Sequence, residues 1–211
     1  MRALLMIICA MLAWSAPTAA LAQRAADLRQ VEIVSLSVRI DASGDEFKVI
    51  DARMDETATA AVFFGLVGAT INSAANAAED DAKADPLRPT AAALPLEQLI
   101  GDALRARLAS RNTIALAASP QDASHTLVVE IGDWGLIRRA QRPDTFVRPF
   151  LKLNLSLLDA RGRPVWGPQR EHSISQTAAE LSAFTPETFR LEMEALAARA
   201  GHQVANRLIY R

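Results

Sequence analysis

The sequence is short of cysteine, histidine and aromatic residues. Its single cysteine is Cys9, in the apolar run near the N-terminus, so the rest of the chain cannot form a disulfide framework. The three histidines are widely separated and form no HxxxH or HxH pair; they are His125, His172 and His202. A zinc site would have to be assembled wholly from long-range contacts. We therefore expect no metal and no other cofactor.

An excess of charge of one sign is also missing. The chain has 23 lysines and arginines against 24 acidic residues, for a net charge of -1. A nucleic-acid partner normally requires a basic excess, so we exclude this class of function. Common catalytic patterns are absent as well: the sequence has no Gly-x-Ser-x-Gly elbow, and neither Gly65 nor Gly68 belongs to a phosphate-binding loop. We predict that the chain is not an enzyme.

The first 22 residues have the layout of a secretory signal. Arg2 supplies the positive charge, residues 3–14 form an apolar run, and the small-residue ending is Ala20-Leu21-Ala22. We predict cleavage after Ala22 and an exported, periplasmic or envelope-associated protein; an uncleaved membrane anchor is the alternative. Cys9 lies inside the apolar run, so we do not expect it to carry a lipid.

Hydrophobic patterning after the signal divides the chain into three further parts. Residues 23–85 contain an alternating strand, VEIVSLSVRI, followed by a turn and a weaker strand that together suggest a hairpin, and then an apolar helix. Residues 86–95 contain three prolines and predict a linker without regular helix. Residues 96–211 form the main domain.

The main domain has the most regular patterns of the sequence. An amphipathic helix begins at Leu96, and a final helix begins after Thr185, which can cap it. Between these helices, HTLVVEIGDW and VRPFLKLNLSLL alternate apolar and polar residues, and a poorer third strand covers roughly residues 164–175. The fold class predicted for the domain is α+β, with an antiparallel sheet and helices packed on one face.

The segment Thr57–Ala78 contains no charged residue and is long enough to span a bilayer. Its second half is polar and its flanks are acidic, where a membrane span usually has lysine and arginine. Small residues recur every fourth position and would form a helix-packing stripe: Ala61, Gly65, Ala69 and Ser73. Three interpretations stay open, namely a core helix, an interaction or oligomer helix, and a membrane span.

Arginines and aromatic residues gather around a predicted hairpin tip in IRRAQRPDTFVRPF. This composition is favoured at protein contacts and also suits anionic lipid headgroups. The candidate partner-contact residues are Trp134, Arg138, Arg139, Arg142, Phe146 and Arg148. The partner would be an envelope protein, a second copy of the chain or anionic lipid; a plain solvated hairpin tip is the alternative.

The stretch LLDARGRPVW contains a turn of the type L-x-D-x-x-G-x-x-x-W, formed by Leu157, Asp159, Gly162 and Trp166. With its flanking elements, this turn resembles the auxiliary lipoproteins of lipid ABC transporters, small Gram-negative envelope proteins that combine an antiparallel sheet with helices. The resemblance covers just over half of the chain and implies an accessory, non-enzymatic role. The chain departs from that pattern because it has no lipidated cysteine.

These observations predict an envelope-associated binding or assembly module that acts through a sheet edge, the arginine-rich hairpin or the apolar helix. One alternative is an exported hydrolase whose site is distributed through the fold, drawing on His125, His172, Asp133, Glu130 or a serine. Another is a membrane-embedded accessory protein that uses residues 57–78.

Overall fold

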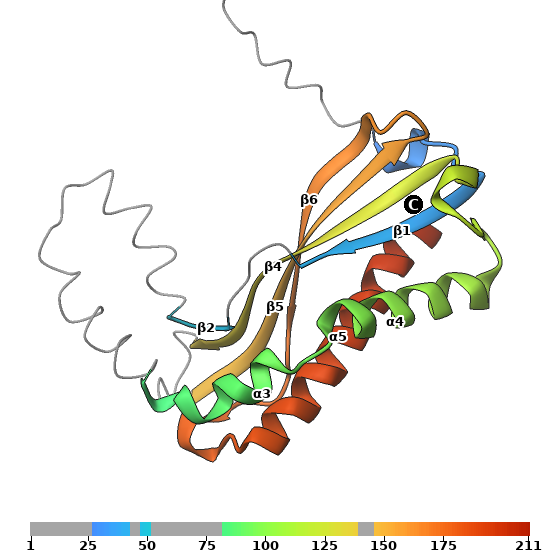
Figure 1. The fold of residues 1–211 in the computed structure, drawn as a ribbon. Helices are drawn as coiled ribbons and strands as arrows, with labels where there is room; N and C mark the ends of the chain where they lie inside the picture. Colours follow the sequence, from blue (N-terminus) through green and yellow to red (C-terminus); the bar gives the residue numbers. More distant parts are fainter. Residues whose placement is uncertain (1–26, 43–46, 52–81, 139–145) are drawn as a thin grey trace, which may run out of the picture.

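The computed structural model describes residues 27–42, 47–51, 82–138 and 146–211. The predicted signal, the segment Thr57–Ala78 with its small-residue stripe, Arg139 and Arg142 lie outside the described residues. In the described part, a twisted sheet is covered on one face by helices, which confirms the α+β class (Figure 1). None of the described helices is both long enough and apolar enough to cross a bilayer.

The larger part of the sheet is formed by three antiparallel strands. β4 (His125–Arg138) pairs with β5 (Phe146–Asp159), which pairs on its other side with β6 (Pro164–Ile174). Alternate leucines of β5 are buried in one core, as the alternation predicts; they are Leu151, Leu153, Leu155 and Leu157. Two strands have only two residues each: β7 (Ala179–Glu180) pairs with β5, and β3 (Ala115–Leu116) pairs with β1, which covers Ser35–Asp41.

The first two strands correct the predicted hairpin. β1 (Ser35–Asp41) and β2 (Phe47–Asp51) do not pair with each other; both run parallel to β4. They lie end to end along the same side of β4, so the sheet is mixed and not purely antiparallel. The alternation of apolar residues fixes which face of a strand is buried, but it does not determine which strand becomes its neighbour.

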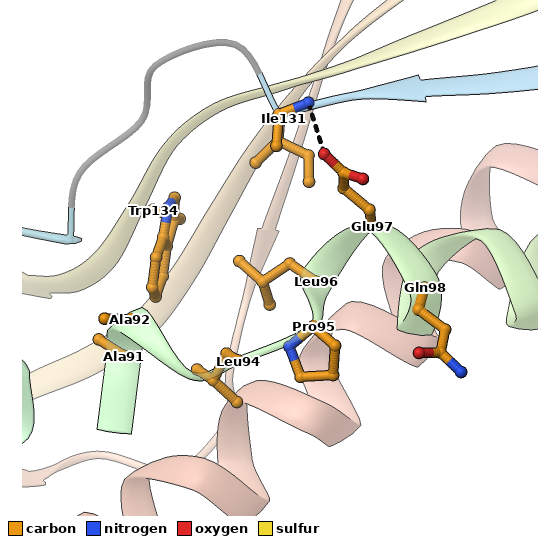
Figure 2. A pocket seen from close by; sticks show the side chains of 10 residues that line it. Ala91, Ala92, Leu94, Pro95, Leu96, Glu97, Gln98, Ile131 and Trp134 are labelled. Atoms are coloured by element: carbon orange, nitrogen blue, oxygen red, sulfur yellow. Dashed lines mark hydrogen bonds between the residues drawn. The ribbon is translucent and has the colours of Figure 1, made fainter. Parts of the chain in front are cut away.

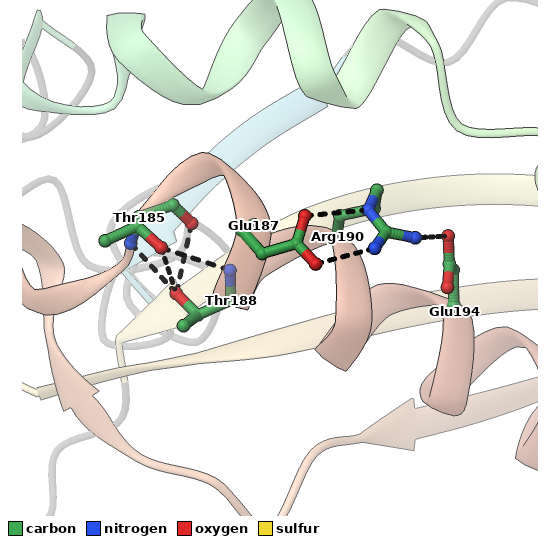
Figure 3. Close-up of polar contacts among 5 residues, drawn as sticks. All are labelled: Thr185, Glu187, Thr188, Arg190 and Glu194. Atoms are coloured by element: carbon green, nitrogen blue, oxygen red, sulfur yellow. Dashed lines mark hydrogen bonds and ion pairs between the residues drawn. The ribbon is translucent and has the colours of Figure 1, made fainter.

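Two long helices cover the sheet, α4 (Leu96–Arg111) and α5 (Pro186–Ile209). α5 begins as predicted: the Thr185 hydroxyl accepts a hydrogen bond from the Thr188 N–H, and the Thr188 hydroxyl accepts one from the Thr185 N–H (Figure 3). Along the first turns, Arg190 forms ion pairs with Glu187 and Glu194. These pairs are largely exposed, so packing of the buried face stabilises the helix more than they do.

The proline-rich connection is more regular than predicted. It contains the 3-10 helix Asp85–Leu87 and the short helix α3 (Arg88–Ala92). Pro86 and Pro89 each occupy the first turn, where a missing N–H breaks no helical hydrogen bond. Leu87 and Ala91 are buried in the same core as the sheet and the long helices, which corrects the expectation of a linker without regular helix. Further short 3-10 helices cover Leu28–Gln30, Pro120–Asp122 and Leu181–Ala183.

Candidate functional site

A break in the strand pairing of β4 produces the site. β1 pairs with β4 as far as Glu130, and β2 begins to pair at Trp134. Within this interval β4 carries a bulge, because Gly132 and Asp133 together lie opposite the single residue Lys152 of β5. Neither β1 nor β2 pairs with residues 131–133, so among the described residues the pairing along this side of β4 is interrupted there.

A cavity of about 370 Å³ lies beside this interruption (Figure 2). Ile131 and Trp134 line it from β4, and Ala42 lines it from the end of β1. The Trp134 ring points from the sheet towards α3. The remaining wall belongs to α3, the start of α4 and their connection: Ala91, Ala92, Leu94, Pro95, Leu96, Glu97 and Gln98.

Eight of the ten described lining residues are apolar, and the two polar ones lie at one rim, although polar atoms contribute a substantial share of the exposed surface. At this rim the Glu97 carboxylate accepts a hydrogen bond from the Ala42 N–H at 3.2 Å (Figure 2). Glu97 is the one charged residue among the described residues of the lining, and Gln98 adds an amide beside it. Both side chains are exposed, so a ligand can reach them. A site of this composition suits a ligand with an apolar body and a hydrogen-bond donor or positive charge at one end.

A small charge network lies at the bulge, on the face of the sheet opposite the cavity. The Asp133 carboxylate forms ion pairs with the Lys48 Nζ at 2.5 Å and with the Lys152 Nζ at 3.2 Å. The hydrogen bond from Lys48 is the main reason why the pKa of Asp133 lies below its usual value; partial burial opposes this shift and Lys152 adds to it. Because the two lysines come from β2 and β5, this network links the bulge of β4 to both neighbouring strands.

The predicted partner-contact residues do not form one surface. Trp134 pairs across the sheet with Leu151, and Arg138 pairs with Val147, and cross-strand partners share a face. Leu151 and Val147 belong to the core, so Trp134 and Arg138 lie on the helix-covered face. Trp134 is only 6% exposed, and its ring meets Phe47 edge-on. Burial places Trp134 in the lining of the cavity and not on an exposed surface, so its role as a partner contact stays a prediction.

The other members of this set lie elsewhere. Arg148 pairs with Ile137 on the opposite face of the sheet, and Phe146, two residues earlier on the same strand, shares that face. Arg138, Phe146 and Arg148 are all half-buried. Arg139 and Arg142 are outside the described residues, so their role as contacts stays a prediction.

The residues considered for a hydrolase show one close contact. Ser124 Oγ lies 3.0 Å from His125 Nδ1, near Asp159 on the neighbouring strand. The Ser124 hydroxyl, however, donates to the Ser35 carbonyl at 2.8 Å and accepts the Ser35 N–H at 3.0 Å. Burial lowers the pKa of His125, against the opposing effect of Asp159. This geometry serves to join β1 to the start of β4.

The other hydrolase candidates are placed apart from that pair. His172 is exposed on β6, and Glu130 is exposed in the middle of β4, opposite Asn154. None of these residues lines the cavity beside Trp134. Ala42 and Glu97 were not predicted as site residues, because the described lining comes from three segments that are distant in the chain and no local pattern links them.

Comparisons with known proteins add similarities of limited extent. No protein-family model matches the sequence, and no curated protein sequence matches it either. A minor lipoprotein from Acinetobacter baumannii is 13% identical over 55% of this chain and 87% of its own, with a TM-score of 0.41. A protein from Xanthomonas campestris is 14% identical over 83% of each chain, with a TM-score of 0.42. A putative lipoprotein from Caulobacter crescentus is 18% identical over 55% of this chain and 78% of its own, with a TM-score of 0.34. At these values no match assigns a family or an activity to the chain.

Proposed function

We propose that this chain is a non-enzymatic binding module of the cell envelope and that the cavity between β1 and β2 holds the apolar part of what it binds. The observation that carries the proposal is the cavity itself, which is lined by apolar side chains and has one carboxylate, Glu97, at its rim. The signal-like N-terminus supports export to the envelope.

The shape and chemistry of the cavity favour binding over structural filling. Its volume of about 370 Å³ is within the range of small-ligand pockets, and it opens to solvent at the rim where Glu97 and Gln98 are exposed. An apolar group that enters the cavity would remove its own surface and that of the lining from water. This burial stabilises the complex by about 25 cal/mol per Å² of apolar surface. Glu97 would then select among apolar ligands those that also bring a donor.

A fluorescent apolar probe tests the proposal directly. N-phenyl-1-naphthylamine is neutral and becomes strongly emissive in apolar surroundings, and energy transfer from Trp134 reports its position. Substitution of Trp166 by phenylalanine removes the tryptophan of β6, leaving Trp134 as the reporter outside the predicted signal. We expect saturable binding with transfer from Trp134.

A matched pair of variants locates the probe. Ala92→Phe places a ring at the rim of the cavity, whereas Ala93→Phe adds the same ring at the next position, which does not line it. Both alanines are exposed, so neither change disturbs the core. Loss of about 60 Å² of apolar contact would weaken binding about tenfold in Ala92→Phe only. Equal affinity in the two variants, or no saturable binding, would refute the proposal.

A further inference from the structure

Strand β1 has an edge that is only partly paired. β4 lies along one side of it, from Leu36 to Asp41, while on the other side β3 reaches only Ser35 and Leu36. The chain leaves this edge after Ala117, whose N–H donates to the Leu36 carbonyl at 3.0 Å. Beyond Leu36, no described strand pairs with the outer side of β1.

The direction of the backbone groups follows from this last hydrogen bond. In a parallel sheet, the N–H and the C=O of one residue point to the same side of the strand, and those of the next residue point to the other side. The backbone N–H and C=O groups of Leu36 point towards β3. The backbone groups of Val38, Ile40 and Ala42 therefore point to the same outer side of β1. The Ala42 N–H is taken by the Glu97 carboxylate. The outward peptide groups of Val38 and Ile40 therefore lie between Leu36, which is bonded to Ala117, and Ala42, which is bonded to Glu97.

The opposite edge of the sheet, formed by β6, is protected against pairing with another strand. β6 contains Pro164 and Pro168, and its pairing with β5 is interrupted by register shifts. Prolines and irregularities of this kind prevent edge-to-edge pairing with another strand. β1 has no proline, no lysine and an unbroken register with β4. β1 does carry the charged residues Arg39 and Asp41, but it has no proline or register shift that would prevent a further strand from pairing at Val38 and Ile40.

We propose that an extended peptide segment of a partner protein pairs with β1 at Val38 and Ile40 and places an apolar side chain in the cavity. The proposal rests on the proposed function, because it uses the same cavity. A row of alternating N–H and C=O groups is matched best by another peptide backbone. Ala42, at the rim of the cavity, is two residues beyond Ile40, roughly 7 Å along the strand, so one segment can reach both.

The chemistry of the rim also defines the sequence of this segment. The Glu97 carboxylate accepts the hydrogen bond of the Ala42 N–H. In a paired strand, a backbone carbonyl would take the place of this carboxylate. A pairing segment would displace the carboxylate, which would then meet a positive side chain of the segment. We therefore expect an apolar residue with lysine or arginine next to it.

Selection from a library of random heptapeptides, displayed on phage, against the purified full chain tests the inference. The enriched peptides should contain an apolar residue beside a basic one. Synthetic copies are then N-methylated at single positions, which removes one backbone donor at a time. Methylation at alternate residues should weaken binding about tenfold, and methylation at the residues between them should leave it unchanged. Insensitivity at every position would overturn the inference.

Variants of the chain provide a second readout. Val38→Pro removes an outward N–H that β4 does not use and should weaken peptide binding about tenfold. Ala92→Phe should weaken it as well, whereas Ala93→Phe should not. Failure to enrich any peptide, or dimerisation of the chain that Val38→Pro abolishes, would overturn the inference of a partner peptide. If the naphthylamine probe still binds in the cavity, the proposed function stands even though this inference fails.

Discussion

The contact between the two long helices leads to a quantitative prediction for Gly201→Ala. A Cβ atom on Gly201 of α5 would lie 2.4 Å from the Ile100 carbonyl oxygen and 3.0 Å from the Leu104 nitrogen of α4. Both are backbone atoms, so the helices would have to move apart. Overpacking of this kind costs about 3 kcal/mol at the upper end of its usual range. The better helix propensity of alanine returns about 1 kcal/mol, which leaves a net loss of about 2 kcal/mol.

Gly101→Ala is the matched control, in the other helix of the same pair. Its added Cβ would meet the Arg105 Nη1 at 2.9 Å and the Ile40 Cδ1 at 3.1 Å. Both are the ends of side chains that can turn away, so the gain in helix propensity should leave the stability unchanged or slightly higher.

Thermal unfolding followed by circular dichroism at 222 nm compares the two variants. For a domain of this size, a loss of about 2 kcal/mol lowers the Tm by about 4–8 °C. Urea unfolding gives the same difference in free energy if the slope is unchanged. The reasoning about close helix packing would be refuted if Gly201→Ala were as stable as the unsubstituted chain, or if Gly101→Ala lost as much.

The remaining predictions concern the bulge and the polar layer under α5. Gly135→Ala should detach β2, because φ is +134° and the added Cβ would meet the Lys48 carbonyl oxygen; faster amide hydrogen exchange in residues 47–51 would show it, and unchanged exchange would contradict it. Ser175→Ala should cost about 1–2 kcal/mol, since the buried hydroxyl donates to Glu192 at 2.7 Å and accepts the Thr177 N–H; urea unfolding measures this loss. Asp133→Asn should cost about 0.5 kcal/mol at pH 7, a small value because the pair with Lys48 is partly exposed. The lowered pKa of Asp133 means that its stabilisation is present above about pH 4 and lost below it, so the two proteins should converge in acid; a difference that persists there would refute this role.

Local sequence patterns were sufficient for the elements of the main domain. The leucines of β5 repeat every second residue and are buried together, and the threonine and proline before residue 187 start α5 where the sequence predicts it. These features depend on neighbours within a few residues, so their physical causes are readable in the chain itself. The same holds for the balanced charge and the signal-like N-terminus, which rest on composition alone.

The candidate site depended on long-range placement. The partner-contact residues were chosen by composition, yet alternation along β4 and β5 places Trp134 and Arg148 on opposite faces of the sheet. The cavity lies beside the bulge of β4, at the described residues of β4 that pair with neither β1 nor β2.

The sequence by itself determined the main strands and helices of residues 96–211 and which face of each is buried, because periodicity expresses burial directly. The tertiary structure alone decided which strands are neighbours, which described part of the sheet edge has no strand beside it and which described segments line the cavity. Those outcomes depend on competition among backbone pairings that are similar in local energy and differ in how the rest of the chain packs around them.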